Sequence, residues 1–345
     1  MRKKKIFLGA YINHINAQNI NCKSIAIHLD KDKYEVKTLL LGKNNIPDIS
    51  GVKYIIISKL FYKISNLLAF IRGTLWADVL YMPKHQSTPR FILRIANLLS
   101  KKIFTTIEGN MCNMNVKSMI DSFGSKQNMI NYFKYISNIY AITQHLVDTS
   151  NCGVKLNPNP LKLGVEQHFF KNECTKESLN NIVFVGSLIK RKKIDEILRV
   201  ASLFTELNFH IVGDGELRKT LESRSSDNVI FHGQQPHDKM LDLFAKMDLH
   251  ILLSRSEGYP KVILETASSS IPSLVYNDYG ASSWINSNEN GFVVDTIDQV
   301  MNKINELINN PELLKKNSEG AYLFSVNYDW KKIIKEWECE IDNLR

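Results

Sequence analysis

The feature that most constrains the fold is an alternation of short apolar runs with helix-length segments, which occurs twice along the chain. In the first half, strand-like runs occupy residues 5–10, 34–41, 53–58, 77–82, 102–107, 139–143 and 154–157. Helical runs lie between them, roughly at residues 17–29, 60–75, 89–99 and 129–136. Because most of these strands precede a helix-length segment, the pattern predicts a parallel, doubly wound sheet.

A turn-rich stretch separates the two halves. Asn157-Pro158-Asn159-Pro160 break the pattern, and the chain turns through residues 163–166, as is typical of a linker. The alternation then restarts, with strand-like runs at 181–186, 209–213, 229–232, 249–253, 273–276 and 291–294 and helical runs at 195–205, 216–224, 237–245, 299–308, 311–324 and 328–344. A chain of 345 residues also exceeds the usual size of one core. We expect two Rossmann-like α/β domains, residues 1–165 and 166–325, that face one another across a cleft at the carboxyl ends of their strands.

Charge is divided unequally between the halves. Residues 1–170 hold 23 Lys and Arg against 9 Asp and Glu, whereas residues 171–345 hold 21 against 26. A basic half suggests a polyanionic partner, either nucleic acid or an anionic membrane surface. A general bias toward a soluble surface explains the same numbers equally well.

The cysteines and the apolar runs bear on the compartment. The five cysteines contain no C-x-x-C pair, which predicts reduced thiols in a cytosol, without a disulfide framework or a zinc site. The basic start resembles the first part of a signal peptide, but the apolar run at residues 6–10 is too short to continue one. No apolar run approaches a membrane-spanning length. We therefore expect a cytoplasmic protein.

The segment from Ser254 to Pro272 is the most informative about chemistry. An apolar strand leads into a loop with Glu257 and Gly258, Pro260 stands where a helix is expected to begin, and Glu265 follows Glu257 by eight positions. A strand, a glycine turn and a helix N-terminus form an anion-binding pocket from backbone groups. Two carboxylates beside it suggest a ligand with phosphates and hydroxyls, such as a nucleotide sugar. Spacing alone also fits an ordinary α/β unit with a solvated glutamate.

A second candidate site follows the strand at residues 181–186. There a glycine turn leads into the run Lys190-Arg191-Lys192-Lys193, immediately before a helix. Cations that converge with backbone donors at a helix start can bind a diphosphate. The alternative is a solvated run of charge.

These segments resemble the glycosyltransferases of family four, which are retaining enzymes of the GT-B fold. Their signature reads S-x-x-E-G-x-P-x-V-x-x-E-A, and only its last position departs, with Thr266 in place of Ala. Lys192 falls on the lysine of the family's G-R-L-x-x-x-K-G loop, whereas Ser187 replaces its arginine and Lys193 its final glycine. The G-D-G loop at Gly213 and the V-x-F-x-G strand that ends at Gly233 also match. The resemblance is strong over residues 181–345.

In the first half the resemblance lies in the pattern more than in the letters. Gly9, after the first strand, is placed like a glycine whose backbone approaches the donor phosphates. Glu108 takes the place of a histidine that interacts with the sugar in relatives, and His85 follows a neighbouring strand. A carboxylate can accept a hydrogen bond from a sugar hydroxyl, but a structural role for Glu108 and a surface position for His85 remain alternatives.

The resemblance implies transfer of a sugar from a nucleotide diphosphate sugar to a glycan or lipid-linked glycan, with retention of configuration. Glu257 would contact the donor sugar and Glu265 the ribose, while Lys192 with Lys190 or Arg191 would stabilise the diphosphate. The other implied substrate-binding residues are Gly9, Gly213, Gly233, Gly258, Tyr259, Pro260 and Lys261. Glu108 and His85 would act on the acceptor side. Residues 326–345 would form a helix that crosses back to the first domain.

No metal or cofactor is expected. Asp30-Lys31-Asp32 is formally a D-x-D, but it joins a helix to a strand and is typical of a solvated turn, and no other cluster has metal-ligand spacing. Cations and helix dipoles would instead neutralise the leaving diphosphate. A nucleotide-sugar 2-epimerase of the same architecture is an alternative. A nucleic-acid-binding protein is another, although no recognised binding motif supports it.

Basic and apolar residues are mixed at residues 59–64, 70–72 and 90–94. Apolar helices in an α/β domain mostly face the core. The alternative is a peripheral anchor on an anionic leaflet, which would suit a glycan acceptor carried on a lipid. A bacterial surface-polysaccharide intermediate is the acceptor that the resemblance suggests.

Overall fold

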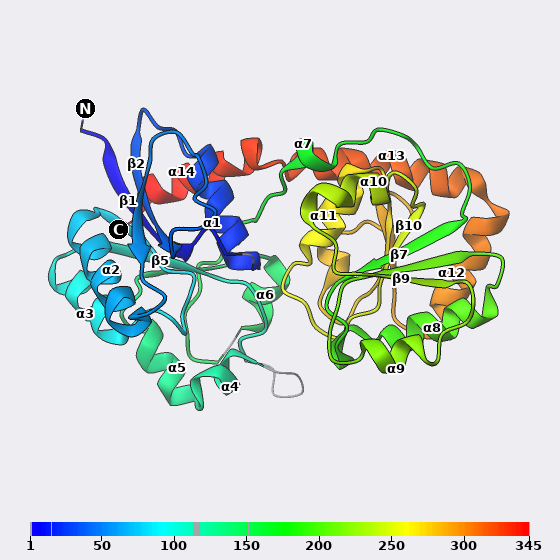
Figure 1. The fold of residues 1–345 in the computed structure, drawn as a ribbon, viewed down its shortest axis with the longest axis horizontal. Coiled ribbons are helices and arrows are strands. Elements are labelled where there is room, and N and C mark those ends of the chain that lie inside the picture. Colours follow the sequence, from blue (N-terminus) through cyan, green and yellow to red (C-terminus); the bar gives the residue numbers. More distant parts are fainter. Residues whose placement is uncertain (1, 15, 113–117, 151, 345) are drawn as a thin grey trace. The chain divides into compact units, whose positions relative to one another are not determined.

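The protein was analysed as a computed structural model, which describes all residues except 1, 15, 113–117, 151 and 345. The chain divides into two compact units, one of Met1–Gly164 with Trp330–Arg345 and the other of Val165–Asp329. Each unit is a parallel sheet of six strands with helices packed around it (Figure 1). The prediction of two doubly wound α/β domains is therefore confirmed.

The first unit has the strand order β3-β2-β1-β4-β5-β6, with all neighbours parallel. Its strands are β1 (Lys4–Tyr11), β2 (Tyr34–Leu41), β3 (Val52–Ile57), β4 (Val79–Tyr81), β5 (Lys102–Ile107) and β6 (Asn138–Ala141). Its helices are α1 (Ala17–His28), α2 (Tyr62–Trp76), α3 (Arg90–Leu98), α4 (Met119–Phe123), α5 (Lys126–Phe133), α6 (Gln144–Thr149) and α14 (Trp330–Asn343).

The second unit has the order β12-β11-β10-β7-β8-β9, again parallel throughout. Its strands are β7 (Asn181–Val185), β8 (Asn208–Val212), β9 (Val229–Gly233), β10 (Leu249–Leu252), β11 (Ser273–Tyr276) and β12 (Gly291–Val294). Its helices are α7 (Gln167–Phe170), α8 (Ile194–Leu203), α9 (Arg218–Glu222), α10 (Met240–Phe244), α11 (Lys261–Ser268), α12 (Ile297–Asn309) and α13 (Pro311–Asn327), with 3-10 turns η1 (Lys190–Lys192), η2 (His237–Lys239) and η3 (Ala281–Ser283).

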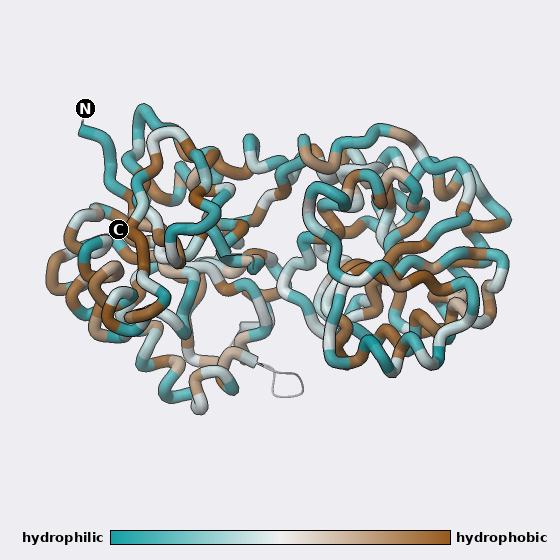
Figure 2. Tube along the Cα trace, in the orientation of Figure 1, coloured by the Kyte–Doolittle hydropathy of each residue, from teal (hydrophilic) through white to brown (hydrophobic). Residues whose placement is uncertain are grey.

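The strands at the middle of each sheet are buried on both faces. In β1 the side chains from Ile6 to Tyr11 are buried, and all four residues of β10 are buried as well. Figure 2 shows hydrophobic colour along the strands of both units. Helices on both faces of a parallel sheet exclude water from either side, so the strands appear in the sequence as continuous apolar runs.

Two details differ from the sequence-based expectation. Residues 154–157 were expected to form a strand but have no regular structure; instead, Asn157 N donates to Ile139 O at 2.7 Å alongside the edge strand β6. The helices α4, α6 and α7, of four to six residues each, were not predicted. One turn of helix carries too little periodic signal to be distinguished from a loop.

The C-terminal helix α14 belongs to the first unit, as expected. Trp330 and Trp337 are fully buried, and Trp337 Nε1 donates to Lys162 O at 2.8 Å. Lys4 Nζ lies 2.7 Å from Asp342 Oδ1. The two buried indoles anchor the last helix on a sheet that is built from the first half of the chain.

The prediction that all cysteines are reduced is wrong. Cys112 and Cys152 form a disulfide across a sequence separation of 40, with Cα atoms 5.6 Å apart. Cys22, Cys174 and Cys339 take no part in a disulfide. Cys112 follows β5 and Cys152 follows α6, and the fold brings these two segments together. No local spacing motif could therefore predict the pairing.

Removing this bridge should destabilise the protein. Cross-linking residues this far apart restricts the unfolded chain, so the double variant Cys112→Ser, Cys152→Ser should lose about 2–4 kcal/mol of unfolding free energy. Urea denaturation monitored by circular dichroism measures the loss. Cys174→Ser, an exposed free thiol, is the matched control and should change little. Equal stability of the double variant and the parent would contradict a bridge in solution.

Candidate active site in the second unit

Three glycine turns meet where the strands β7, β8 and β9 end. Gly186 N donates to Val212 O at 2.9 Å, and Gly213 N donates to Gly233 O at 2.8 Å. A Cβ on Gly213 would lie 1.9 Å from Gly186 O, and Gly213 has a φ of +132°. Only glycine permits this approach of two backbones. The predicted sites Gly213 and Gly233 therefore lie side by side at the carboxyl edge of the sheet.

The turn after β7 carries the cations. Lys190, Arg191 and Lys192 form η1, and Lys193 follows in the left-handed region with φ of 50°. The Lys192 side chain is 10% exposed, whereas Lys190 is exposed. This turn therefore directs one ammonium group inward, and burying a charge in this way requires a partner.

Glu257 is that partner. Its Oε1 lies 2.6 Å from Lys192 Nζ and 2.8 Å from Arg191 Nη1, and its side chain is 10% exposed. Arg191 also donates to Ser256 O, and Arg255 N donates to Arg191 O at 3.0 Å. These bonds hold the loop after β10 against the turn after β7. Of the three predicted cations, the structure brings Arg191 and Lys192 to Glu257.

The helix after this loop begins one residue later than expected. Pro260 is the N-cap and α11 starts at Lys261, with Glu265 half-buried on the helix. Burial raises the pKa of Glu265, and the charge of Lys261 partly opposes the shift. Thr266, which departs from the family pattern, is fully buried, and its hydroxyl donates to Val262 O at 2.9 Å. The extra hydroxyl is thus satisfied within the helix.

The predicted binding residue Tyr259 lies in an aromatic cluster whose other members the sequence analysis did not assign to the site. The Tyr259 ring packs on Trp284 at a centroid distance of 4.7 Å and on Tyr328 at 5.7 Å. Within the described part of the chain, Tyr279 Oη, Trp284 Nε1 and Ser254 Oγ are buried without a hydrogen-bond partner. Burial and the charge of Glu257 both raise the pKa of Tyr279. Buried polar atoms without partners are available to a ligand. For Tyr279 and Trp284 the sequence signal was that two aromatic residues follow β11.

His250 on β10 lies beneath the same site. Its Nδ1 is 2.9 Å from Ser273 Oγ, and the side chain is fully buried. Burial lowers the pKa of His250 to about 3, and the charge of Lys192 adds to the shift. The imidazole is therefore neutral at neutral pH, which avoids a second positive charge beside Lys192.

This burial makes stability depend on pH. Because the folded pKa lies below the ordinary value of 6.5, the unfolded chain binds a proton first as pH falls, and stability declines below about pH 6.5. Between about pH 7 and about pH 5 His250 should account for a loss of about 2 kcal/mol. Urea denaturation at both pH values should therefore show a smaller loss for His250→Gln than for the parent. His145→Gln, on the half-exposed α6, is the control. An equal loss in His250→Gln and the parent would contradict the pKa shift.

The first unit gathers the other predicted residues near the carboxyl ends of β4 and β5. Glu108 Oε2 accepts from Asn21 Nδ2 at 3.1 Å, and Glu108 Oε1 accepts from Thr106 Oγ1 at 3.2 Å. His85 Nε2 lies 2.7 Å from Thr105 Oγ1. The predicted pair therefore lies on neighbouring strand ends, as parallel topology requires.

His85 is buried rather than on the surface. Its ring makes edge contacts with Tyr132 and Phe133, and burial lowers its pKa to about 4. His85 and Gly109 line a hollow of about 400 Å³ whose other walls include Lys84, Asn110 and Ser118. Of the predicted site residues His85 lines this hollow, and Glu108 directly precedes Gly109 in its wall.

Gly9 does not follow the first strand, as was expected, but lies within β1. A Cβ there would stand 2.9 Å from Met82 Sδ and 3.2 Å from the Phe70 ring. The expected loop position is therefore wrong. The missing side chain makes room for the packing of α2 and of the residue after β4 on β1.

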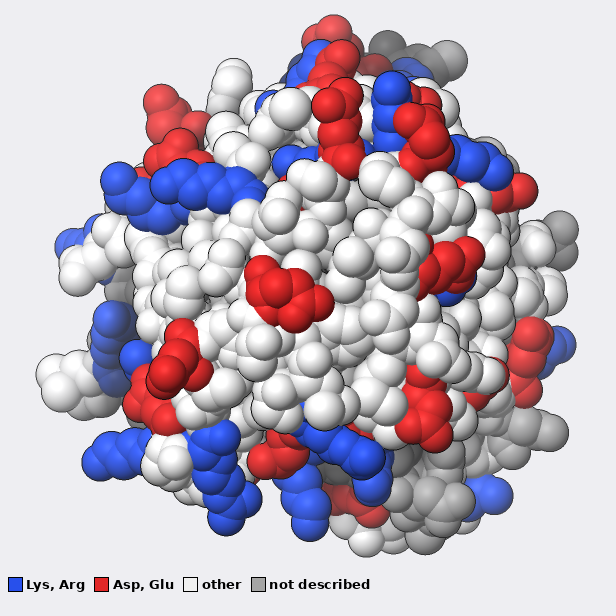
Figure 3. All heavy atoms as spheres, turned by 90° about the vertical axis from the view of Figure 1, so that its right-hand side faces the viewer, with Lys and Arg blue, Asp and Glu red and all other residues white. Residues whose placement is uncertain are grey.

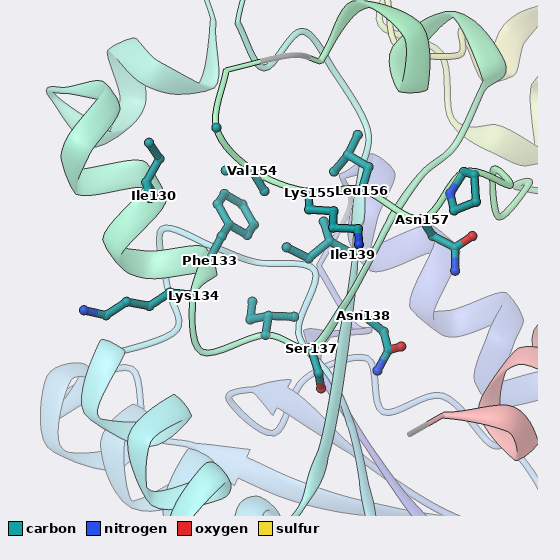
Figure 4. A pocket seen from close by; sticks show the side chains of 13 residues that line it. Ile130, Phe133, Lys134, Ser137, Asn138, Ile139, Val154, Lys155, Leu156 and Asn157 are labelled. Atoms are coloured by element: carbon teal, nitrogen blue, oxygen red, sulfur yellow. The ribbon is translucent and has the colours of Figure 1, made fainter.

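Another hollow of the first unit, of about 430 Å³, lies between α5, the start of β6 and residues 153–158 (Figure 4). Apolar side chains such as Ile130, Phe133 and Val154 surround it, and Lys134 extends away from them (Figure 4). None of the predicted site residues lines it.

Charge is distributed differently in the two units. The first holds 27 Lys and Arg against 12 Asp and Glu, and the second 17 against 23. Figure 3, which faces the right-hand side of Figure 1, shows both signs interspersed. The cations beside Glu257 are thus a local arrangement in an acidic unit.

Among the described residues no group of three or more His, Cys, Asp or Glu has a metal-binding arrangement. In the same residues no helix is long and apolar enough to span a membrane.

Comparison with known proteins identifies the enzyme class. Residues 165–324 match the model of the family described as glycosyl transferases group 1. An uncharacterized glycosyltransferase of Haemophilus influenzae is 30% identical over 210 residues, which cover 56% of each chain. The chain is a glycosyltransferase. Another uncharacterized glycosyltransferase, from Methanocaldococcus jannaschii, is 25% identical and matches 95% of this enzyme and 93% of its own length. The alpha-galactosylglucosyldiacylglycerol synthase of Streptococcus pneumoniae is 30% identical over 45% of this enzyme and 44% of its own length.

Solved structures confirm the GT-B architecture of the glycosyltransferase. Sucrose-phosphate synthase from Thermosynechococcus elongatus has a TM-score of 0.82 at 12% identity, with 99% of both chains covered. Anabaena HepE in complex with UDP-glucose has a TM-score of 0.77 at 15% identity, with 99% of this enzyme and 100% of that chain covered.

Proposed function

We propose that this glycosyltransferase transfers a sugar from a nucleotide diphosphate sugar to a glycan or lipid-linked glycan, with retention of configuration and without a metal ion. The observation that carries the proposal is the convergence of Lys192 and Arg191 on Glu257 at the start of α11. Lys192 and Glu257 are nearly enclosed by protein, whereas Arg191 is partly exposed. Two cations and one carboxylate meet the needs of a ligand with a diphosphate at one end and hydroxyls at the other.

The cations stabilise the leaving group. As the bond from the anomeric carbon to the diphosphate oxygen breaks, negative charge grows on the diphosphate, and Lys192 and Arg191 compensate it without a metal. The amide groups around Gly258, Tyr259 and Lys261, at the start of α11, add the positive end of a helix dipole. The acceptor hydroxyl oxygen then bonds to the anomeric carbon, and its proton passes to the leaving diphosphate oxygen.

Glu257 exchanges its partners when the donor binds. Without a ligand it neutralises both cations. A bound diphosphate would take over the cations and free the Glu257 carboxylate to accept a hydrogen bond from a sugar hydroxyl. Glu265, half-buried along the helix, would then bind the ribose. In the first unit, Glu108 and His85 lie beside the hollow that we assign to the acceptor.

The names of similar proteins suggest which ligands to test first. HepE was solved with UDP-glucose, which makes uridine diphosphate the first nucleotide to examine. The pneumococcal relative is named as a synthase of a glycosylated diacylglycerol, which favours an acceptor carried on a lipid.

Product analysis tests the proposal. The enzyme should convert a UDP-sugar and a soluble acceptor analogue into a glycoside with the anomeric configuration of the donor, in the presence of EDTA, as read by NMR coupling constants. Inversion of configuration, or loss of transfer in EDTA, would overturn the corresponding part of the proposal. Epimerised donor in a reaction without acceptor would instead show an epimerase.

Lys192 and Lys190 offer a matched pair of variants. Lys192→Met should weaken binding of the preferred nucleoside diphosphate by at least about 30-fold, because a desolvated charge contact is lost. Lys190→Met should bind almost normally, because Lys190 is exposed and lies apart from Glu257. Isothermal titration calorimetry measures both, after circular dichroism has shown that each variant is folded. Equal effects at the two positions would contradict the assignment of Lys192.

A further inference from the structure

Helix α2 of the first unit carries more apolar surface than its packing buries. Ala69, Phe70 and Gly73 face inward, and Gly73 lies so close to the Phe7 ring that a Cβ would clash with it. On another side of the helix Ile64 is 64% exposed and Leu75 is 58% exposed. Their spacing places these two on one face of a helix. Helix α2 is thus apolar on two faces, of which only one is packed.

The exposed apolar surface continues beyond α2. Helix α3 packs beside α2 (Figure 1) and buries Ile92, Leu93 and Ala96. Other apolar side chains of α3, and those of the turn before α2, remain in solvent. We define the α2–α3 face as the exposed apolar residues Leu60, Phe61, Ile64, Leu68, Leu75, Phe91, Leu98 and Leu99. A cluster of this kind marks an interaction surface.

The chain segment that contains the α2–α3 face is strongly basic. From residue 49 to residue 107 the chain holds nine Lys and Arg but only one acidic residue, Asp78, which pairs with Arg2 at 3.1 Å. Lys59, Lys63 and Arg72 are exposed and, within the described residues, form no ion pair. The partner must therefore accept apolar side chains and supply negative charge.

A hollow of about 490 Å³ adjoins this face at the start of α2. Lys43 and Lys59 line it, together with Ser58 and Ser65. The Lys59 stem lies along Gly42, 3.1 Å from where a Cβ would stand. Two ammonium groups and two hydroxyls suit a phosphate group that belongs to the same partner.

We propose that the α2–α3 face docks on a bilayer that contains anionic phospholipids, with a headgroup phosphate in the hollow between Lys43 and Lys59. The apolar side chains enter the boundary of the acyl chains, while the cations meet the headgroups. A second copy of this chain is disfavoured, because a symmetric contact would bring like charges together. The inference extends the proposed function, since a lipid-linked acceptor would lie in the same membrane.

Vesicle co-sedimentation tests this docking without donor or acceptor. The enzyme should bind vesicles that are an equimolar mixture of phosphatidylcholine and phosphatidylglycerol. Salt should weaken this binding. The double variant Lys59→Gln, Lys63→Gln should bind about 30-fold more weakly, and Ile64→Ser about tenfold more weakly. All the changed side chains are exposed, so the variants should fold.

Matched controls come from the second unit. Leu323→Ser removes an apolar side chain with the same 64% exposure as Ile64, and Lys239→Gln with Lys246→Gln removes two exposed cations. These controls should bind vesicles like the parent. Equal binding to pure phosphatidylcholine, no binding at all, or variants that bind like the parent would each overturn the proposal. A parent dimer that Ile64→Ser converts to a monomer in gel filtration would show a copy interface instead.

The proposed function can fail independently of this docking. Transfer to a soluble acceptor analogue reports on the catalytic site alone, and the Lys59 and Ile64 variants should retain it. Vesicle binding without transfer would refute the proposed function, whereas transfer without vesicle binding would refute the docking.

Discussion

Replacing Glu257 by glutamine should lower the rate of sugar transfer by at least about 100-fold while the variant still binds a nucleoside diphosphate. The amide keeps the shape and an acceptor atom but loses the charge that faces Lys192 and Arg191. Because the carboxylate no longer competes for these cations, the affinity for a nucleoside diphosphate should stay the same or rise. Transfer is measured by released nucleotide and affinity by calorimetry.

The split between transfer and binding separates catalysis from structure. If Glu257 were only structural, Glu257→Gln would lose both transfer and nucleotide binding. The reason is that the loop after β10 would no longer be held to the turn after β7. Leaving Lys192 without a carboxylate should reduce stability by about 2 kcal/mol, so both assays are run well below the unfolding midpoint. Glu206→Gln, at an exposed position, is the control and should be fully active. Normal turnover by Glu257→Gln would refute the proposed site.

Gly213→Ala should destabilise the second unit by at least about 4 kcal/mol, an effect that few single substitutions reach. The new Cβ would stand 1.9 Å from Gly186 O, and the residue would have to keep a φ of +132°. Neither backbone can move without breaking the bonds that join the ends of β7, β8 and β9. Urea denaturation, or the loss of soluble protein on expression, measures the effect.

Gly109→Ala is the control for this substitution. Gly109 has nothing within 4 Å of its Cβ position, so the change should shift the unfolding free energy by less than about 0.5 kcal/mol. If Gly213→Ala is as stable as Gly109→Ala, the turns after β7 and β8 do not touch in solution as described.

The sequence predicted much of the fold because the signals for it are local. Short runs of strand-forming residues predicted β2, β5, β11 and β12 with their observed ends. Short helices were missed, since a single turn such as α7 has no recognisable period. The sequence also predicted Glu257 on a loop and Glu265 on the helix after it, because the loop and the helix are continuous in the chain.

Local patterns in the chain establish the two alternations of strand and helix, and the cations and carboxylates that follow particular strands. Long-range packing alone establishes that Lys192 turns inward to Glu257 while Lys190 stays in solvent. It also establishes that Cys112 meets Cys152 and that α2 keeps an unpacked apolar face. The reason is physical: residue types and spacing set local conformation, whereas the direction of a side chain and its partner depend on segments that fold against it from elsewhere in the chain.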